Sequence, residues 1–140
     1  MSPRPVRKRW SATDLMARAE KARKRAYAPY SNFPVGAALL ASDGRVYEGA
    51  NVENSSFGLS ICAERNAMWK AIGDGVRDFE AIAVTAGPKS GASPCGACRQ
   101  VLHEFAPNLW VMWRAGKGKV IKRRLSRLLD SAFVFPRKGR

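Results

Sequence analysis

Three cysteines in two short segments constrain this 140-residue chain more than any other feature of its sequence. Cys62 lies in ICAER at 61–65, and Cys95 and Cys98 lie in SPCGACRQ at 93–100. Each segment opens a stretch whose apolar residues recur at helical spacing, so we expect the sulfurs at helix N-termini. Unpaired N–H groups and the helix dipole favour a thiolate there, and the thiolate is the form that binds metal ions.

The spacing of these cysteines predicts a catalytic metal site. Cys95 and Cys98 are three residues apart, so one helical turn can direct both sulfurs at one ion, and Cys62 would reach it from the other helix. Three protein ligands leave the fourth position of a zinc ion to water, whereas a structural zinc site takes four. The single histidine, His103, lies further along the predicted helix, and we expect it to be an ordinary helix residue rather than a fourth ligand.

Glu64 follows Cys62 by two residues, which places its carboxylate beside the metal without making it a ligand. A metal lowers the pKa of bound water and a neighbouring carboxylate moves the proton, so the pair is suited to hydrolysis. A lone Cys-x-x-Cys also fits a redox pair or half of a structural zinc site. Cys-Ala-Glu together with a later Pro-Cys-x-x-Cys is far more specific, and it is the signature of zinc deaminases.

The charge of such a site predicts a positively charged side chain next to the cysteine sulfurs. Zn²⁺ with three thiolates carries a net charge of about −1, which weakens its Lewis acidity. Arg65 directly follows the Cys-Ala-Glu motif, so it is a candidate to donate hydrogen bonds to the sulfurs, and Arg99 is a second candidate. For Arg99, a surface or interface ion pair is an equally good interpretation.

The apolar pattern predicts alternating helices and strands. Ser11 and Asp14 form a capping box that opens a helix, which we expect to end at Pro29, and Asp43-Gly44 predicts a hairpin. The other expected elements are strands at 34–41, 45–52, 79–86, 109–113 and 120–125, helices at 62–72 and 96–105, and a helical turn at 126–129. This order predicts one domain over 1–140, a three-layer α/β/α sandwich with a mixed sheet.

Basic residues concentrate at the two ends of the chain. The formal net charge is +14, of which residues 1–25 carry +7 and residues 114–140 carry +9, while the stretch between them carries −2. We expect residues 1–10 and 134–140 to be flexible. Two interpretations of the charge remain, solvated ends that aid solubility or attraction of an anionic substrate or polyanion, including nonspecific binding of nucleic acid.

Other features of the sequence indicate the compartment. It has no run of about 18 apolar residues and no apolar core of a secretory leader, so we expect no membrane span and no signal peptide. An odd number of cysteines argues against a disulfide framework. We therefore expect a cytoplasmic protein.

Four segments resemble the cytidine deaminase family, in particular its small three-cysteine branch of homotetramers. They are YSNFPVGAA at 30–38, NVEN at 51–54, ICAER at 61–65 and PCGACRQVL at 94–102, with a weaker match at 128–133. The resemblance implies a cytidine deaminase-like fold and hydrolysis of cytidine or deoxycytidine to uridine or deoxyuridine plus ammonia in pyrimidine salvage. It also implies that Cys62, Cys95 and Cys98 bind Zn²⁺, while Glu64 moves protons between water, N3 and the leaving amine.

The same resemblance assigns the substrate contacts. Phe33 would stack on the pyrimidine, Asn51 and Glu53 would hold the ribose hydroxyls, the backbone N–H of Ala63 would read the base edge, and Phe133 would pack at another chain's pocket. An Asn and a carboxylate two residues apart on a strand point to the same side and suit a diol. Core packing is the alternative for Phe33, and a polar strand end is the alternative for Asn51 and Glu53.

The chain also departs from the family pattern. Phe57 replaces a common tyrosine, Asp130 replaces a common proline, and residues 117–127 are far more basic than usual. These departures leave open a phosphorylated or polymeric cytosine substrate, or a nucleoside antibiotic such as blasticidin S. The Asn-x-Glu pair favours a free ribose, because Glu53 would repel a phosphate on the 3′ oxygen.

Overall fold

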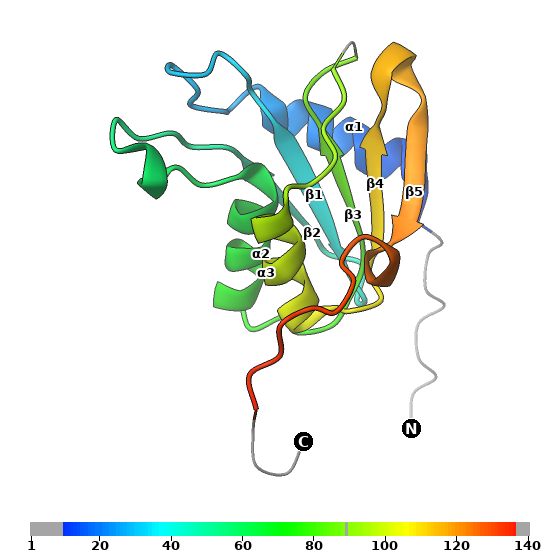
Figure 1. Ribbon diagram of the computed structural model, residues 1–140. Helices are drawn as coiled ribbons and strands as arrows, with labels where there is room; N and C mark the ends of the chain where they lie inside the picture. Colours follow the sequence, from blue (N-terminus) through cyan, green and yellow to red (C-terminus); the bar gives the residue numbers. More distant parts are fainter. Residues whose placement is uncertain (1–9, 89, 137–140) are drawn as a thin grey trace.

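The computed structural model describes residues 10–88 and 90–136, which form helices on both faces of one mixed sheet (Figure 1). The predictions for residues 1–9 and 137–140 lie outside the described residues. The strand order is β2-β1-β3-β4-β5. β3 and β4 are parallel, and the other neighbouring strands are antiparallel. The strands are β1 (Gly36–Ala41), β2 (Val46–Ala50), β3 (Phe79–Thr85), β4 (Trp110–Arg114) and β5 (Val120–Arg124).

Within the described residues, three α-helices complete the predicted sandwich. Helix α1 (Ala12–Arg23) covers one face of the sheet, and α2 (Ala63–Gly73) and α3 (Gly96–Phe105) cover the other (Figure 1). The interior strand β1 is buried along its whole length, because its alternating side chains pack on both faces of the sheet. Leu39 packs in the α2 and α3 cluster with Met68, and Leu40 packs in the α1 cluster with Met16. The described part of the chain also contains short 3₁₀ turns, η1 (Phe57–Leu59), η2 (Gly116–Gly118) and, after β5, η3 (Leu125–Arg127).

A close contact between β2 and α2 fixes where the cysteine-bearing helix begins. A Cβ atom on Gly49 would overlap the backbone of Ala63 and Ala67. Only glycine therefore allows α2 to pack this close to β2. Cys62 and Glu64 flank Ala63 at the start of this helix. The position of the predicted metal site therefore depends on a residue that carries no functional group.

Most predicted elements are confirmed to within two residues, and the end of the first helix is the exception. The N–H of Asp14 donates to Ser11 Oγ at 3.3 Å, as the capping pattern predicts. The prediction that this helix continues to Pro29 is wrong, because α1 ends at Arg23. Beyond it, the N–H of Tyr27 donates to the carbonyl of Asn51 at 2.9 Å, which draws the chain away from the helix axis. Within the described residues, no helix has the length and apolar character that a bilayer crossing requires.

Candidate active site

The three cysteine sulfurs meet where α2 and α3 begin. Cys62 is the N-cap of α2, Cys95 is the N-cap of α3, and Cys98 lies in the first turn of α3. Their Sγ atoms all lie within 4.8 Å of one another. Zinc with Zn–S bonds of about 2.3 Å holds tetrahedral sulfurs roughly 3.8 Å apart, so small side-chain rotations bring all three onto one ion. The donor set fits Zn²⁺, and His103, in the last turn of α3, is outside this cluster.

The surroundings of the sulfurs favour a thiolate at Cys62. The Cys98 thiol and the Arg65 guanidinium donate hydrogen bonds to the Cys62 sulfur, which lowers the pKa of Cys62 to about 5 despite its partial burial. The pKa of Cys98 is raised, because its thiol is the donor in that bond and because it is buried. The N–H of Cys98 also points at Cys95 Sγ, at 3.5 Å. The cluster is therefore arranged to hold negative charge on sulfur, as a metal site requires.

The carboxyl group of Glu64 is buried beside the sulfurs. Its residue is only 4% exposed and lies in the first turn of α2. Burial raises the pKa of Glu64, and the negative charge of Cys62 acts in the same direction. A carboxylate with a raised pKa is a stronger proton acceptor than an ordinary glutamate, which is a property expected of a general acid and base.

The two candidate arginines have different partners. Arg65 Nη2 donates to Cys62 Sγ at 3.3 Å, so this side chain reaches the cluster as predicted. Arg99 does not, and its guanidinium nitrogens donate instead to the Pro94 carbonyl at 2.8 Å, Ser93 Oγ at 2.8 Å and the Leu128 carbonyl at 2.6 Å. Arg99 therefore ties the loop before Cys95 to the C-terminal turn and acts on the cysteines only through the backbone.

Asn51 and Glu53 both hold the loop that carries Phe33. Asn51 Oδ1 accepts a hydrogen bond from the N–H of Val35 at 2.8 Å, and Asn51 Nδ2 donates to the Phe33 carbonyl at 3.0 Å. Glu53 Oε1 accepts from the N–H groups of Tyr30 at 3.0 Å and Ser31 at 3.1 Å. The two side chains point toward the same loop, as their spacing predicts.

The segment 51–53 also lies directly beside the residues that lead into Cys62. Val52 forms a backbone bridge with Ile61, with N–H to carbonyl distances of 3.0 and 2.9 Å. Ile61 immediately precedes Cys62, so the bridge connects the Phe33 loop with the start of α2. The predicted substrate contacts and the sulfur cluster therefore belong to one connected region.

Ser31 is a contributor to this region that the sequence analysis did not identify. Its hydroxyl donates to Glu53 Oε2 and accepts from the N–H of Phe33 at 3.1 Å. The hydrogen bond that the Ser31 hydroxyl donates to Glu53 lowers the pKa of Glu53. A serine hydroxyl often accepts a hydrogen bond from the N–H two residues later in a turn. The spacing of Ser31 and Phe33 in the sequence could therefore have predicted this contact.

The other predicted contacts differ in exposure. Ala63 is the first residue of α2 and fully buried, and the N–H of a first helical residue has no acceptor within the helix. Phe33 is 43% exposed and Phe133 is 68% exposed. The backbone of Phe133 is held by Gln100, whose amide donates to its carbonyl at 2.8 Å and accepts from its N–H at 3.3 Å.

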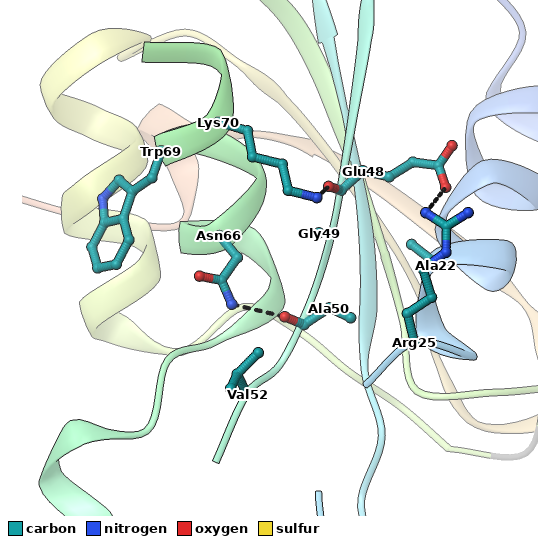
Figure 2. A pocket seen from close by; sticks show the side chains of 9 residues that line it. All are labelled: Ala22, Arg25, Glu48, Gly49, Ala50, Val52, Asn66, Trp69 and Lys70. Carbon is teal, nitrogen blue, oxygen red and sulfur yellow. Dashed lines mark hydrogen bonds and ion pairs between the residues drawn. The ribbon is translucent and has the colours of Figure 1, made fainter. Parts of the chain in front are cut away.

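A cavity of about 480 Å³ opens between α1, β2 and α2 (Figure 2). Lys70 Nζ crosses it to the Glu48 carbonyl at 2.7 Å, and Asn66 Nδ2 donates to the Ala50 carbonyl at 2.8 Å. The cavity is lined by Ala22, Arg25, Glu48, Gly49, Ala50, Val52, Asn66, Trp69 and Lys70. It contains none of the predicted site residues, and it is separate from the sulfur cluster.

The fold and the site together define a zinc-dependent deaminase. The chain belongs to the family described as "Cytidine and deoxycytidylate deaminase zinc-binding region", whose model matches residues 10–113, and zinc is its cofactor. It is 50% identical over 120 residues to a cytidine deaminase from Sporosarcina psychrophila, covering 85% of this chain and 88% of the relative. It is 49% identical over 121 residues to one from Halalkalibacterium halodurans, covering 86% and 92%.

A solved structure shares the architecture. The crystal structure of cytidine deaminase from Burkholderia pseudomallei matches with a TM-score of 0.84 and 46% sequence identity. The match covers 89% of this chain and all of that chain. The mixed sheet with helices on both faces is thus the fold of an enzyme family with this zinc chemistry.

Proposed function

We propose that the protein hydrolyses cytidine and deoxycytidine to uridine and deoxyuridine with release of ammonia. The observation that carries this proposal is the buried carboxyl group of Glu64 beside three sulfurs that lie within 4.8 Å of one another. We assign Cys62, Cys95 and Cys98 as the zinc ligands and Glu64 as the catalytic residue. The high identity to cytidine deaminases over most of the chain supports the same activity.

The chemistry assigns distinct tasks to groups at the start of α2. Zn²⁺, when bound, supplies a Lewis acid that lowers the pKa of water. Glu64 takes one proton from the attacking water and gives it to N3 of the ring. It then takes the second proton, from the hydroxyl now bonded to the ring carbon, and gives it to the leaving amino nitrogen, which departs as ammonia; its raised pKa suits it to accept a proton in each step. The N–H of Ala63 is aimed outward from the helix start and donates to the base edge. Arg65 withdraws charge from Cys62 through its hydrogen bond.

The nucleoside contacts follow from the loop that Asn51 and Glu53 hold. Each side chain keeps hydrogen-bonding capacity beyond the bonds it makes to the loop, because an amide offers two N–H groups and each carboxylate oxygen has two lone pairs. Holding the loop and binding ribose hydroxyls are therefore compatible. Phe33, which is 43% exposed, offers its ring to the pyrimidine.

We further propose a homotetramer located in the cytoplasm. Several large apolar side chains are at least half exposed in the single chain, among them Tyr27, Phe57, Leu59, Phe133 and Phe135. Exposed apolar side chains in such number favour burial against other copies, with Phe133 at another chain's pocket. Thiols that must stay reduced to bind metal favour the cytoplasm. Light scattering tests the assembly, and a fully active monomer would contradict it.

A phosphorylated or polymeric cytosine substrate is the second candidate, and the basic ends of the chain are the observation that favours it. Deamination of blasticidin S is a further alternative. Glu53 argues against a polymer, because a carboxylate beside the ribose hydroxyls repels a phosphate on the 3′ oxygen.

The deciding experiment measures zinc content and then steady-state deamination of cytidine, deoxycytidine, CMP, blasticidin S and a cytosine-containing oligonucleotide. We expect one zinc per chain and the highest kcat/KM with the free nucleosides. A protein that is active without zinc, or that prefers the oligonucleotide, would overturn the proposal.

A further inference from the structure

Two tryptophans and two cations form a patch on the α1 side of the sheet, here called the cation–indole patch and made of Trp10, Trp110, Lys122 and Arg124. Lys122 Nζ lies 4.8 Å from the ring centroid of Trp10 and 4.4 Å from that of Trp110. The Arg124 guanidinium carbon lies 3.8 Å from the Trp110 centroid. Both rings are partly exposed and pack against the core cluster of α1.

The chain around the patch has a strong excess of positive charge. Residues 105–129 contain seven basic residues and no acidic one. Trp110 lies on β4, and Lys122 and Arg124 lie on β5, which is a terminal strand of the sheet. Residues 4–9, directly before Trp10 in the sequence, contain four further basic residues. A long anionic chain is the partner that such one-sided charge attracts.

Protection of a sheet edge is the competing explanation for charges on β5. Lysine and arginine on a terminal strand discourage pairing with other chains. That purpose does not call for partly exposed indoles, which themselves favour association. The alternation of cations with aromatic rings is instead the composition of surfaces that bind single-stranded nucleic acid, where phosphates contact cations and bases stack on rings.

We propose that the cation–indole patch binds single-stranded nucleic acid without sequence preference. One ammonium group, that of Lys122, lies over both indoles, so both rings border the space it fills. When Lys122 turns onto a phosphate, this space opens to a base. Arg124 donates one N–H to the Asn108 carbonyl at 2.8 Å, which anchors the guanidinium and leaves its other N–H groups for a phosphate.

The patch and the sulfur cluster lie on opposite faces of the sheet. Trp10 and Trp110 pack with the α1 cluster, whereas the cysteines belong to α2 and α3 on the other face. Binding at the patch therefore leaves the active site open, and the proposal does not depend on which nucleoside the enzyme deaminates.

The test uses the full-length zinc enzyme and a labelled oligodeoxythymidylate of about 20 nucleotides, longer than the strand one domain covers. It contains no cytosine and so cannot be a substrate. Fluorescence anisotropy over a range of salt gives Kd and its salt dependence. For Lys122→Gln with Arg124→Gln we expect the slope of log K against log salt to shrink by about 1.4, which is roughly a 25-fold weaker Kd at about 0.1 M salt.

The matched control is Lys21→Gln with Lys24→Gln, which removes the same charge from the far end of α1, more than about 15 Å from Trp10 along the helix. We expect this control to change Kd much less than the patch variant. Trp10→Ala should weaken binding of the oligonucleotide and not of inorganic polyphosphate, because only the former has bases to stack. Saturating oligonucleotide should leave cytidine turnover unchanged.

Four results would overturn the proposal. The first is an equal loss of oligonucleotide affinity in the patch and control variants, and the second is competitive inhibition of cytidine turnover by the oligonucleotide. The third is an affinity for polyphosphate that equals the affinity for the oligonucleotide, with Trp10→Ala changing neither. The fourth is preferential binding of anionic phospholipid vesicles through the same residues.

Discussion

The sulfur cluster and the cation–indole patch hold charge in opposite ways. At the sulfur cluster, hydrogen bonds from Cys98 and Arg65 and the adjoining helix N-termini stabilise negative charge, despite partial burial. At the patch, positive charge stays at the surface over the faces of two indoles. The first arrangement activates groups for chemistry, whereas the second leaves cations free to exchange partners. The comparison shows how a strongly basic chain can also carry an active site for a nucleoside. The negative charge of the sulfur cluster and the positive charge of the patch lie on different faces of the sheet.

The largest expected effect is a loss of activity at the sulfur cluster that leaves the cation–indole patch unchanged. Glu64→Gln removes proton transfer while keeping the shape of the buried side chain, so kcat/KM for cytidine should fall by about 10²–10⁴. Zinc content and oligonucleotide binding should not change. Glu104→Gln, on the exposed side of α3, is the matched control and should retain activity. Near-native turnover by the Glu64 variant would remove this residue from the mechanism.

Removal of the metal should have the next largest effect. Cys95 is exposed, so Cys95→Ser is compatible with folding, and zinc per chain should fall well below one. A chelator acting on the unmodified protein should lower its free energy of unfolding by about 2.7 kcal/mol where zinc had been present at 100 times its Kd. Elemental analysis and thermal unfolding measure both quantities. Full zinc occupancy in the serine variant would contradict the ligand assignment.

A smaller effect is expected at Arg65, which tunes the cluster from outside the ligand set. Arg65→Gln loses the donor to Cys62 Sγ, so zinc affinity should weaken by about 10–100-fold, and Arg65→Lys should recover part of it. In the metal-free protein, the pKa of Cys62 should rise from about 5, because one of its stabilising hydrogen bonds is gone. Competition with a chelator and the pH dependence of thiol alkylation give the two values. Unchanged affinity would show that Arg65 has only a structural role.

The smallest effect should come from Ser31, which acts only through the loop. Ser31→Ala removes the bond to Glu53 and the support of the Phe33 N–H, so KM for cytidine should rise about 3- to 10-fold with kcat nearly unchanged. The pKa of Glu53 is lowered in the folded protein, so its stabilising contribution is present above its ordinary pKa of about 4.3 and is lost as pH falls below it. The variant should therefore lose less stability on acidification, and NMR titration of Glu53 should show its pKa moved upward. A fall in kcat with constant KM would contradict a positioning role.

The sequence alone determined the elements and the chemistry carried by short spacings. Cys95 and Cys98 share one helical turn, Glu64 follows Cys62 at a helix start, and Asp43-Gly44 closes a hairpin. Each of these depends on residues a few positions apart, whose relative placement follows from the geometry of a single turn or strand. For that reason the zinc site and the sandwich order could be predicted without coordinates.

Only the tertiary structure decided which distant residues touch. It placed Arg99 on the Leu128 carbonyl instead of on a sulfur, it turned Asn51 back onto the Phe33 loop, and it brought Trp10 to Lys122 across most of the chain. These contacts depend on strand order and on register, such as the pairing of Trp110 with Arg124. A register shift of one residue would move every side chain of β5 to the other face. The spacing of residues along the sequence does not determine strand order and register, because these depend on the packing of helices on both faces of the sheet.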